Sequence, residues 1–307
     1  MDVQSLKTSL LDLSKPIAMR THAAFHLRTL GTTEAVEVIC EALLQREDSE
    51  LMRHELAYIL GQMRNNVAIP VLTKVLEDLN DDVLVRHEAA EALGAIGNIA
   101  AKDTLERYLD DAAVEVRETC RLAVDLLIWG DANKAADDVS SSSSSVFNSI
   151  DPAPAEEGTA STEELAGALM DTSQSLFKRY RAMFALRNQN TDDSALALVR
   201  ALSDSSALVR HEIAYVLGQM QRSCTVPGLV EVLRDTKEHR MVRHEAAEAL
   251  GAIGGTEAAE ALKPFLEDEE AVVKESCDVA LDTIDYWATG FAAGAAAEAT
   301  ASVGVGE

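Results

Sequence analysis

The feature that most constrains the fold is an internal repeat, which one basic residue marks in each copy. Eight segments of helical pattern align on this residue: Arg20, Arg53, Arg86, Arg117, Arg179, Arg210, Arg243 and Lys274. Neighbouring anchors within each half of the chain lie 31 or 33 residues apart, the length of a helix pair with two short turns. Such a unit buries its apolar face only by stacking on its neighbours. The sequence therefore predicts an all-α fold, a superhelical array of eight helical hairpins in two pseudo-symmetric halves of four.

The residues after each anchor favour helices over strands. After Arg53, apolar side chains recur at helical spacing, for example at Leu56, Ile59 and Met63. Glycines such as Gly94, near the end of the next segment, can end a helix or let a neighbouring helix approach closely. No segment shows the alternation of apolar and polar residues that is typical of a strand.

Composition divides the chain into four parts. Residues 131–160 contain a serine run and two prolines with few apolar side chains, so we expect a flexible linker there. A linker of that length lets the second half fold back and face the first. The two repeat halves are then 1–130 and 161–288, and the Ala/Gly-rich residues 289–307 are expected to form a disordered tail.

Charge and cysteine content exclude several classes of function. The net charge of −25 disfavours binding to nucleic acid or to an anionic membrane, and it suits a basic partner. The four cysteines show no C-x-x-C spacing, so neither disulfides nor a thiolate metal site is expected. Because the first residues show no signal-peptide pattern and no apolar run is long enough for a membrane span, we expect a soluble, cytoplasmic protein.

A His-Glu pair directly follows the anchor in only some of the repeats. It is absent from the outer repeats of each half and fills the two inner ones, at His54-Glu55, His87-Glu88, His211-Glu212 and His244-Glu245. A pair that served only helix stacking would be equally useful in the outer repeats. Its distribution therefore indicates a functional site shared by the inner repeats.

Four imidazoles with up to four carboxylates are a metal-binding set. Stacked helices lie about 8 to 10 Å apart, so the histidines of neighbouring repeats can converge on one ion. Two histidines with one carboxylate and open coordination positions are typical of non-haem iron(II) oxygenases, whereas structural zinc prefers closed thiolate sites and magnesium or calcium prefers oxygen ligands. Two such sets facing each other predict a di-iron centre that reduces dioxygen.

The choice of carboxylates stays open at this point. Residues four apart share a helix face better than adjacent residues do, so Glu91 and Glu248 compete with the adjacent Glu88 and Glu245 as partners of the histidines. In the second repeat of each half a tyrosine, Tyr58 or Tyr215, holds that later position. This favours the adjacent Glu, and we expect both tyrosines to serve packing.

The four helices also carry a family resemblance. The stretches "RHELAYILGQM" and "RHEIAYVLGQM", each followed by "RHEAAEALGAIG" in the next repeat, resemble the deoxyhypusine hydroxylases. The resemblance covers about residues 5–288 and implies a HEAT-repeat, di-iron monooxygenase of the cytosol. Such an enzyme uses dioxygen and two Fe ions, Fe²⁺ in the reduced form, to hydroxylate deoxyhypusine on a eukaryotic translation initiation factor and so complete hypusine.

The resemblance also implies a role for each His-Glu residue. His54, His87 and Glu88 would hold one iron, and His211, His244 and Glu245 would hold the other. Glu55 and Glu212 would bind the charged amines of the substrate side chain rather than iron. The acidic surface would attract the basic loop around the modified lysine, and the internal dyad would make a monomer sufficient for the site.

Two other functions fit a helical repeat array. A non-catalytic HEAT-repeat scaffold would bind a protein along its concave face, and it would not require His-Glu pairs confined to the inner repeats. A bilin lyase or a related chromophore-handling protein would use similar repeats, without evident need for four His-Glu pairs.

Overall fold

The computed structural model describes residues 2–137 and 147–302, with side chains for 2–133 and 147–289. Those residues form sixteen α-helices and four short 3₁₀ turns, without a strand. The α-helices are α1 (Val3–Leu11), α2 (Ile17–Leu30), α3 (Thr33–Leu43), α4 (Glu50–Met63), α5 (Ile69–Glu77), α6 (Val83–Ile96), α7 (Lys102–Glu106), α8 (Val114–Asp137), α9 (Thr162–Met170), α10 (Leu176–Gln189), α11 (Asp192–Ala201), α12 (Ala207–Met220), α13 (Val226–Arg234), α14 (Arg240–Ile253), α15 (Gly255–Leu262) and α16 (Ala271–Ser302). They pair in order into eight hairpins, so the predicted all-α array is confirmed.

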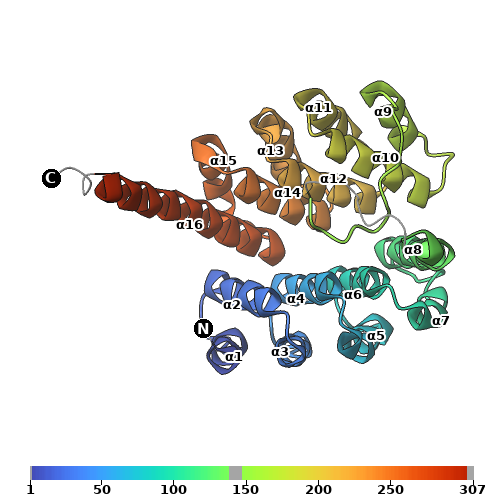
Figure 1. The fold of residues 1–307 in the computed structure, drawn as a ribbon, viewed down its shortest axis with the longest axis horizontal. Helices are drawn as coiled ribbons and strands as arrows, with labels where there is room; N and C mark the ends of the chain where they lie inside the picture. The colour runs from blue at the N-terminus through green and yellow to red at the C-terminus, as the bar shows by residue number, and fades with distance from the viewer. Residues whose placement is uncertain (1, 138–146, 303–307) are drawn as a thin grey trace.

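The even-numbered helices form two inner rows that face each other across a central space. Figure 1 shows α2, α4, α6 and α8 in one row and α10, α12, α14 and α16 in the other, with the odd-numbered helices outside. The rows run in opposite order, so α8 meets α10 at one end and α2 meets α16 at the other. Each row packs on its own outer helices through an apolar core, and the core of the second row also includes Leu51, Leu84 and Leu122 of the first. The inner repeats therefore lie on both sides of the middle of the molecule.

The anchor arginines fix how each inner helix is rotated. Arg53 is 4% exposed; its Nε donates to the Leu43 carbonyl oxygen at 3.0 Å, and its guanidinium pairs with Asp81 at 2.5 and 2.6 Å. The same pattern of one carbonyl and one aspartate recurs at Arg20, Arg86, Arg179 and Arg243. Successive residues of a helix are 100° apart, so a fixed arginine also fixes the direction of the residue that follows it.

Two kinds of glycine shape the inner helices. Gly97 ends α6 with φ of 76°, a left-handed conformation that favours glycine. Gly94 instead lies where α6 touches α8, since a Cβ atom there would be 2.9 Å from the Cβ of Ala123. Gly251 has the same role between α14 and α16. Close approach of the inner helices therefore depends on these positions having no side chain.

We expect Gly251→Ala to destabilise the fold by about 1 to 3 kcal/mol because the added methyl would overpack the contact. Its Cβ would lie 2.7 Å from both the Cα and the Cβ of Ala280. Urea unfolding measures the change. Gly167→Ala in α9 is the matched control: no atom lies within 4 Å of its added Cβ, so that helix should gain roughly 0.5 to 1 kcal/mol. Equal effects of the two changes would contradict the packing role of Gly251.

The linker expected at 131–160 is organised in the parts that the structure describes. Residues 131–137 continue helix α8, and 138–146 lie outside the described residues. Residues 147–160 run between the two rows, and Ala153 is fully buried. The Gln62 side chain makes two hydrogen bonds with the Ile150 backbone, and Arg187 forms a two-pronged ion pair with Asp151 at 2.6 and 2.8 Å. The second part of the linker is thus tied to both halves.

The segment expected as a disordered tail, 289–307, begins inside a helix. Helix α16 runs through Ser302, and residues 303–307 lie outside the described part. Alanine is the strongest helix former, and this stretch is rich in it. Nowhere in 2–137 and 147–302 is there a helix that combines the length and the apolar character of a membrane span.

Candidate metal centre

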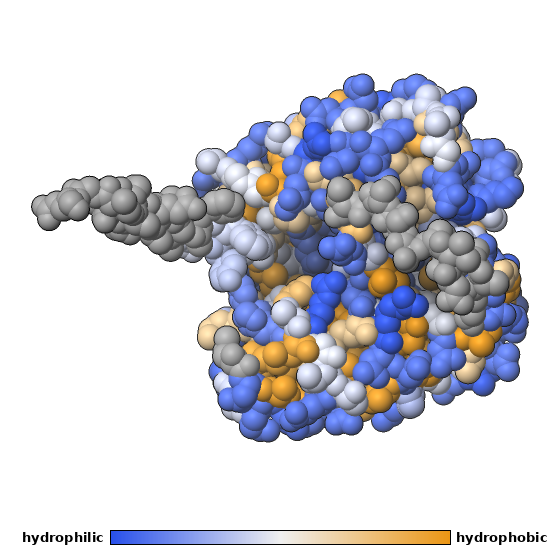
Figure 2. Space-filling model, viewed as in Figure 1, coloured by the Kyte–Doolittle hydropathy of each residue, from blue (hydrophilic) through white to orange (hydrophobic). Residues whose placement is uncertain are grey.

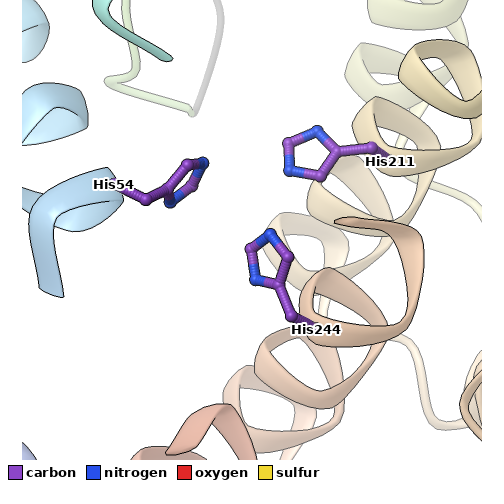
Figure 3. Close-up of side chains that lie close together, drawn as sticks. All are labelled: His54, His211 and His244. Carbon is purple, nitrogen blue, oxygen red and sulfur yellow. The ribbon is translucent and has the colours of Figure 1, made fainter. Parts of the chain in front are cut away.

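Four inner helices carry the predicted histidines to one place. His54 comes from α4, His87 from α6, His211 from α12 and His244 from α14, each directly after its anchor arginine. All four are at most 5% exposed. Figure 3 shows His54 pointing from one row towards His211 and His244 of the other. The repeat register thus directs the imidazoles into the central space.

The four imidazole rings lie close together around the dyad. The ring centroids of His54 and His87 are 5.5 Å apart, as are those of His211 and His244 in the other half. Across the halves, His54 lies 5.1 Å from His244, and His87 lies 5.5 Å from His211. The expected convergence of the two arms is therefore seen in the structure.

Two carboxylates repeat the dyad symmetry. The Oε2 atom of Glu88 lies 3.2 Å from Nε2 of His54, and Oε2 of Glu245 lies 3.3 Å from Nε2 of His211. Each is the glutamate that directly follows a histidine in the third repeat of its half, and both are buried. The structure thus brings all six predicted metal ligands together.

The other carboxylates sit at the edges of the histidine cluster. Glu55 Oε1 is 3.2 Å from Nδ1 of His54, and Glu248 Oε1 is 3.4 Å from Nδ1 of His244. Ser276 also donates a hydrogen bond to Glu248, at 3.2 Å. Glu212 is 2% exposed, and its Oε1 atom has no hydrogen-bond partner among the described residues.

Among the described residues, six of the eight ring nitrogens of the cluster are buried without a hydrogen-bond partner. Within the described residues, partners are lacking for Nε2 of His54, Nε2 of His244 and both ring nitrogens of His87 and of His211. Buried polar atoms of this kind are costly unless a ligand satisfies them. Imidazole nitrogens together with carboxylate oxygens suit a transition metal such as iron. The residues present therefore fit a metal centre.

Three overlapping groups of potential ligand atoms each lie within 4.8 Å in the described part of the chain. They are His54, His87 and Glu88; His54, His211 and His244; and His244, Glu245 and Glu248. The first is the predicted ligand set of one iron. The predicted second set, His211, His244 and Glu245, is divided between the other two groups, where Glu248 joins it. Glu91 enters none of them.

Burial and neighbouring charges shift the pKa values of three of the imidazoles, in different directions. Burial, followed by the neighbouring imidazoles, holds the pKa values of His87 and His244 well below the usual value. Burial also opposes a charge on His54, but the carboxylates of Glu88 and Glu55 outweigh it and raise that pKa well above the usual value. Neutral imidazole is the form that binds a metal, so His87 and His244 are ready to coordinate at neutral pH.

The carboxylates outside the predicted metal-ligand sets repel one another in the cavity. Burial raises the pKa values of Glu212, Glu248 and Glu91 well above the usual range, and neighbouring carboxylates add to each shift. A cationic ligand would relieve this repulsion and favour the charged form of each group. The cavity is therefore suited to a positively charged organic group as well as to a metal ion.

The two tyrosines assigned to packing by sequence instead bridge the halves. Tyr58 and Tyr215 lie one turn beyond His54 and His211, and their hydroxyl oxygens are 2.9 Å apart across the central space. Gln219 donates a second hydrogen bond to the Tyr215 hydroxyl at 2.9 Å. Both tyrosines line a cavity of about 480 Å³ that also contains His54, His211 and the carboxylates around them. Figure 2 shows the molecule hollowed between its two halves.

Sequence reasoning did not find Arg240, which joins the halves. Its guanidinium forms ion pairs with Asp82 at 2.5 and 2.6 Å and with Glu50, both in the other half. Arg240 precedes His244 by four residues and so shares its helix face. The signal available in the sequence was a charged residue on the same helix face as the candidate ligand His244. Of the remaining histidines, His22 pairs with Asp282 at 2.6 Å, where α2 meets α16.

The family models that match the chain are those of helical repeats. The model described as HEAT repeats matches residues 4–84, 53–125 and 195–282. A second model, the PBS lyase HEAT-like repeat, matches residues 178–204.

Several proteins of similar sequence carry the name deoxyhypusine hydroxylase. The chain is 46% identical to the deoxyhypusine hydroxylase of Danio rerio over 289 residues, which cover 93% of this chain and 92% of the relative. The alignments with the deoxyhypusine hydroxylases of Drosophila melanogaster and Candida albicans are 49% and 48% identical, and they span only about half of each relative, 56% and 55% of its length.

A solved structure agrees with these relatives. Human deoxyhypusine hydroxylase in complex with glycerol superposes with a TM-score of 0.87 at 45% identity, covering 92% of this chain and 96% of the human one. The fold, the repeats and the long alignment with the zebrafish protein all point the same way, and the chain belongs to the deoxyhypusine hydroxylase family.

Proposed function

We propose that this protein is a deoxyhypusine monooxygenase. It hydroxylates the deoxyhypusine side chain of the hypusine-bearing eukaryotic translation initiation factor with dioxygen, in the cytoplasm and as a monomer. The observation that carries the proposal is the set of four buried imidazoles, from both halves, in which six of the eight ring nitrogens lack hydrogen-bond partners within the described residues. Neither a protein-binding scaffold nor a bilin lyase needs such a set.

The proposed iron sites use residues of one half each. His54, His87 and Glu88 hold one Fe ion, and His211, His244 and Glu245 hold the other. When bound, the iron pair activates dioxygen for attack on a C–H bond, chemistry that no ordinary side chain supplies. Glu88 and Glu245 each lie beside the imidazole of the neighbouring repeat, so each would complete a set of two imidazoles and one carboxylate.

The remaining residues bind and orient the substrate. Glu55 and Glu212 receive its ammonium groups through charge-assisted hydrogen bonds, as the unpartnered oxygen of Glu212 suggests. The Tyr58–Tyr215 bridge narrows the space beside the imidazoles and limits access of water to the reacting atoms. Because the ammonium groups are held in place, one carbon atom of the substrate side chain points towards the metal centre, and the neighbouring carbon atoms are kept away from it.

The test is a mass measurement on the protein substrate. The iron-loaded protein, a reductant and the deoxyhypusine-bearing factor should give, in air, a product heavier by one oxygen atom. The same mixture without dioxygen should give none, and ¹⁸O₂ should label the product. Full iron occupancy without this product would remove the enzyme assignment. A protein purified without metal that still binds a partner would favour the scaffold.

Substrate binding should weaken with salt. The net charge of −25 attracts a basic loop. Added salt screens this attraction and shortens its range. Between about 0.05 and 0.5 M NaCl we expect KM for the intact factor to rise at least about threefold while kcat changes little. A free small amine, which lacks the basic loop, is the control and should show a weaker dependence. A KM for the factor that is independent of salt would contradict electrostatic attraction.

A further inference from the structure

The carboxylates outside the proposed ligand sets form two pairs, one at each end of the metal centre. Glu55 and Glu248 line two cavities together. Glu91 is the carboxylate whose charge most raises the pKa of Glu212. Each pair joins helices of opposite rows that face each other, α4 with α14 and α6 with α12. All four line the central cavity. The unpartnered, buried oxygen of Glu212 shows that the second pair can accept a hydrogen bond from a ligand. The dyad thus provides two places for a cationic group.

The two ends differ at equivalent positions of the repeat. In the first repeat of each half the residue after the anchor is Thr21 or Tyr180. Tyr180 is fully buried, and its hydroxyl donates to the Leu208 carbonyl oxygen at 3.3 Å, so its ring fills the space beside Glu212. Thr21 is smaller and lines an open cavity. The end with Glu91 and Glu212 is therefore filled where the end with Glu55 and Glu248 is hollow.

The linker covers the filled end. Phe147, Ile150 and Pro152 line the central cavity, and the charge of Asp151 between them adds to the raised pKa values of Glu212 and Glu91. Gln62 from α4 holds Ile150, and Arg187 from α10 holds Asp151, so both rows fix this cover in place. The cover therefore lies over one end of the dyad.

The hollow end leads outwards through a second cavity. It has a volume of about 420 Å³, lies between α2 and α16, and shares Glu55 and Glu248 with the central cavity. Asp282 adds a further acidic group to its wall. Tyr286 and Trp287, 55% and 60% exposed, stand at its rim. The route to the imidazoles thus has mainly apolar walls, with the acidic groups Glu55 and Glu248 at its inner end, Asp282 further out and aromatic rings at its mouth. Apolar walls suit the methylene groups of an amine side chain, and the carboxylates suit its ammonium groups.

We propose that the amine side chain of the substrate enters only between α2 and α16 and lies in one direction across the iron pair. Glu55 and Glu248 hold the secondary ammonium, which is closer to the peptide main chain, and Glu212 and Glu91 hold the terminal ammonium at the covered end. This deepens the proposed function and rests on it. One direction of entry explains how a nearly twofold-symmetric centre presents a single C–H bond of an asymmetric side chain.

Two variants test the route of entry. Ala252→Trp fills the junction of the two cavities at an exposed position near the end of α14, so folding should be unaffected. Its kcat/KM for the deoxyhypusine-bearing factor should fall at least about tenfold. Asn148→Trp is the matched control, an exposed position of the linker cover, and should change kcat/KM less than about twofold. A larger loss in Asn148→Trp, or equal losses in both, would overturn the single entrance.

A double-mutant cycle tests the direction of binding. The probes are two synthetic peptides that carry either deoxyhypusine or N-butyl-lysine, which lacks the terminal ammonium. For the wild type, loss of this ammonium should weaken binding at least about tenfold. In Glu91→Gln the difference between the two peptides should shrink to less than about threefold, because one of the two carboxylates that hold the terminal ammonium is gone. In Glu248→Gln the difference should remain.

The outcomes separate the two proposals. Persistence of the difference in Glu91→Gln with its loss in Glu248→Gln would reverse the direction and overturn this inference, while the hydroxylation of the factor stands. Absence of any hydroxylated product from the wild type would instead remove the proposed function. Iron analysis of each Gln variant guards against a lost metal, since Glu248 contacts His244.

Discussion

Replacing His244 with alanine is expected to remove most of the iron and to lower hydroxylation at least about a hundredfold, because an iron ligand should cost more than the outer partners of a ligand do. His244 belongs to two of the three groups of potential ligand atoms in the described chain, and so does His54. Each of these imidazoles therefore belongs to one group within its own half and to the group that spans the halves, so its loss should disturb the whole centre. Metal analysis should find about two irons per wild-type chain, as a pair of two-histidine, one-carboxylate sites requires, and far fewer in either variant.

The matched control for this change is His26→Ala. His26 is exposed on α2 and lies outside the histidine cluster. Its replacement should leave iron content, activity and stability close to those of the wild type. Circular dichroism of His244→Ala should show unchanged helix content, so that the loss of iron is not a loss of fold. Iron retained in His244→Ala at the wild-type level would exclude this histidine as a ligand.

Asp81→Ala is expected to destabilise the first half by about 3 to 5 kcal/mol, because it leaves the buried guanidinium of Arg53 without its counterion. The side chains of Arg53 and Asp81 are only 5% and 4% exposed. The next residue after Arg53 is His54, so a displaced anchor should also weaken iron binding. Urea unfolding measures the stability, and metal analysis measures the second effect.

An exposed ion pair provides the comparison for Asp81. Glu77 pairs with Arg107, and their side chains are 41% and 58% exposed. Glu77→Ala should therefore cost at most about 1 kcal/mol. If Asp81→Ala costs no more than Glu77→Ala, the anchor arginine does not depend on its aspartate, and the fixed rotation of the inner helices needs another cause.

The repeat architecture was predictable because one residue marks it. An arginine at intervals of 31 or 33 residues predicts stacked hairpins, and the structure shows that this arginine holds its own hairpin and the next one together. The course of the linker was not predictable. Its contacts, such as Asp151 with Arg187, join residues 36 apart, and its polar composition shows no periodicity that would reveal them.

Much of the candidate site was predictable for a similar reason. The His-Glu pairs differ from the other repeats at the same position, so the eight repeats serve as controls for one another. The role of Tyr58 was not predictable, because its partner Tyr215 is 157 residues away and the two meet only across the halves. The choice between Glu245 and Glu248 was not predictable either, because both lie on the same helix as His244 and within reach of it, at spacings that suit either one.

The meeting of α2 with α16 has a consequence for the biosynthesis of the chain. His22 reaches Asp282 across 260 residues, so the ring of repeats closes only when its last hairpin is in place. Local hairpins form early as a chain emerges from the ribosome, whereas contacts this distant in sequence form late. A nascent or truncated protein lacking α14 would expose His54 and His87 without their opposite partners. Capture of iron should therefore mark completion of folding rather than begin it.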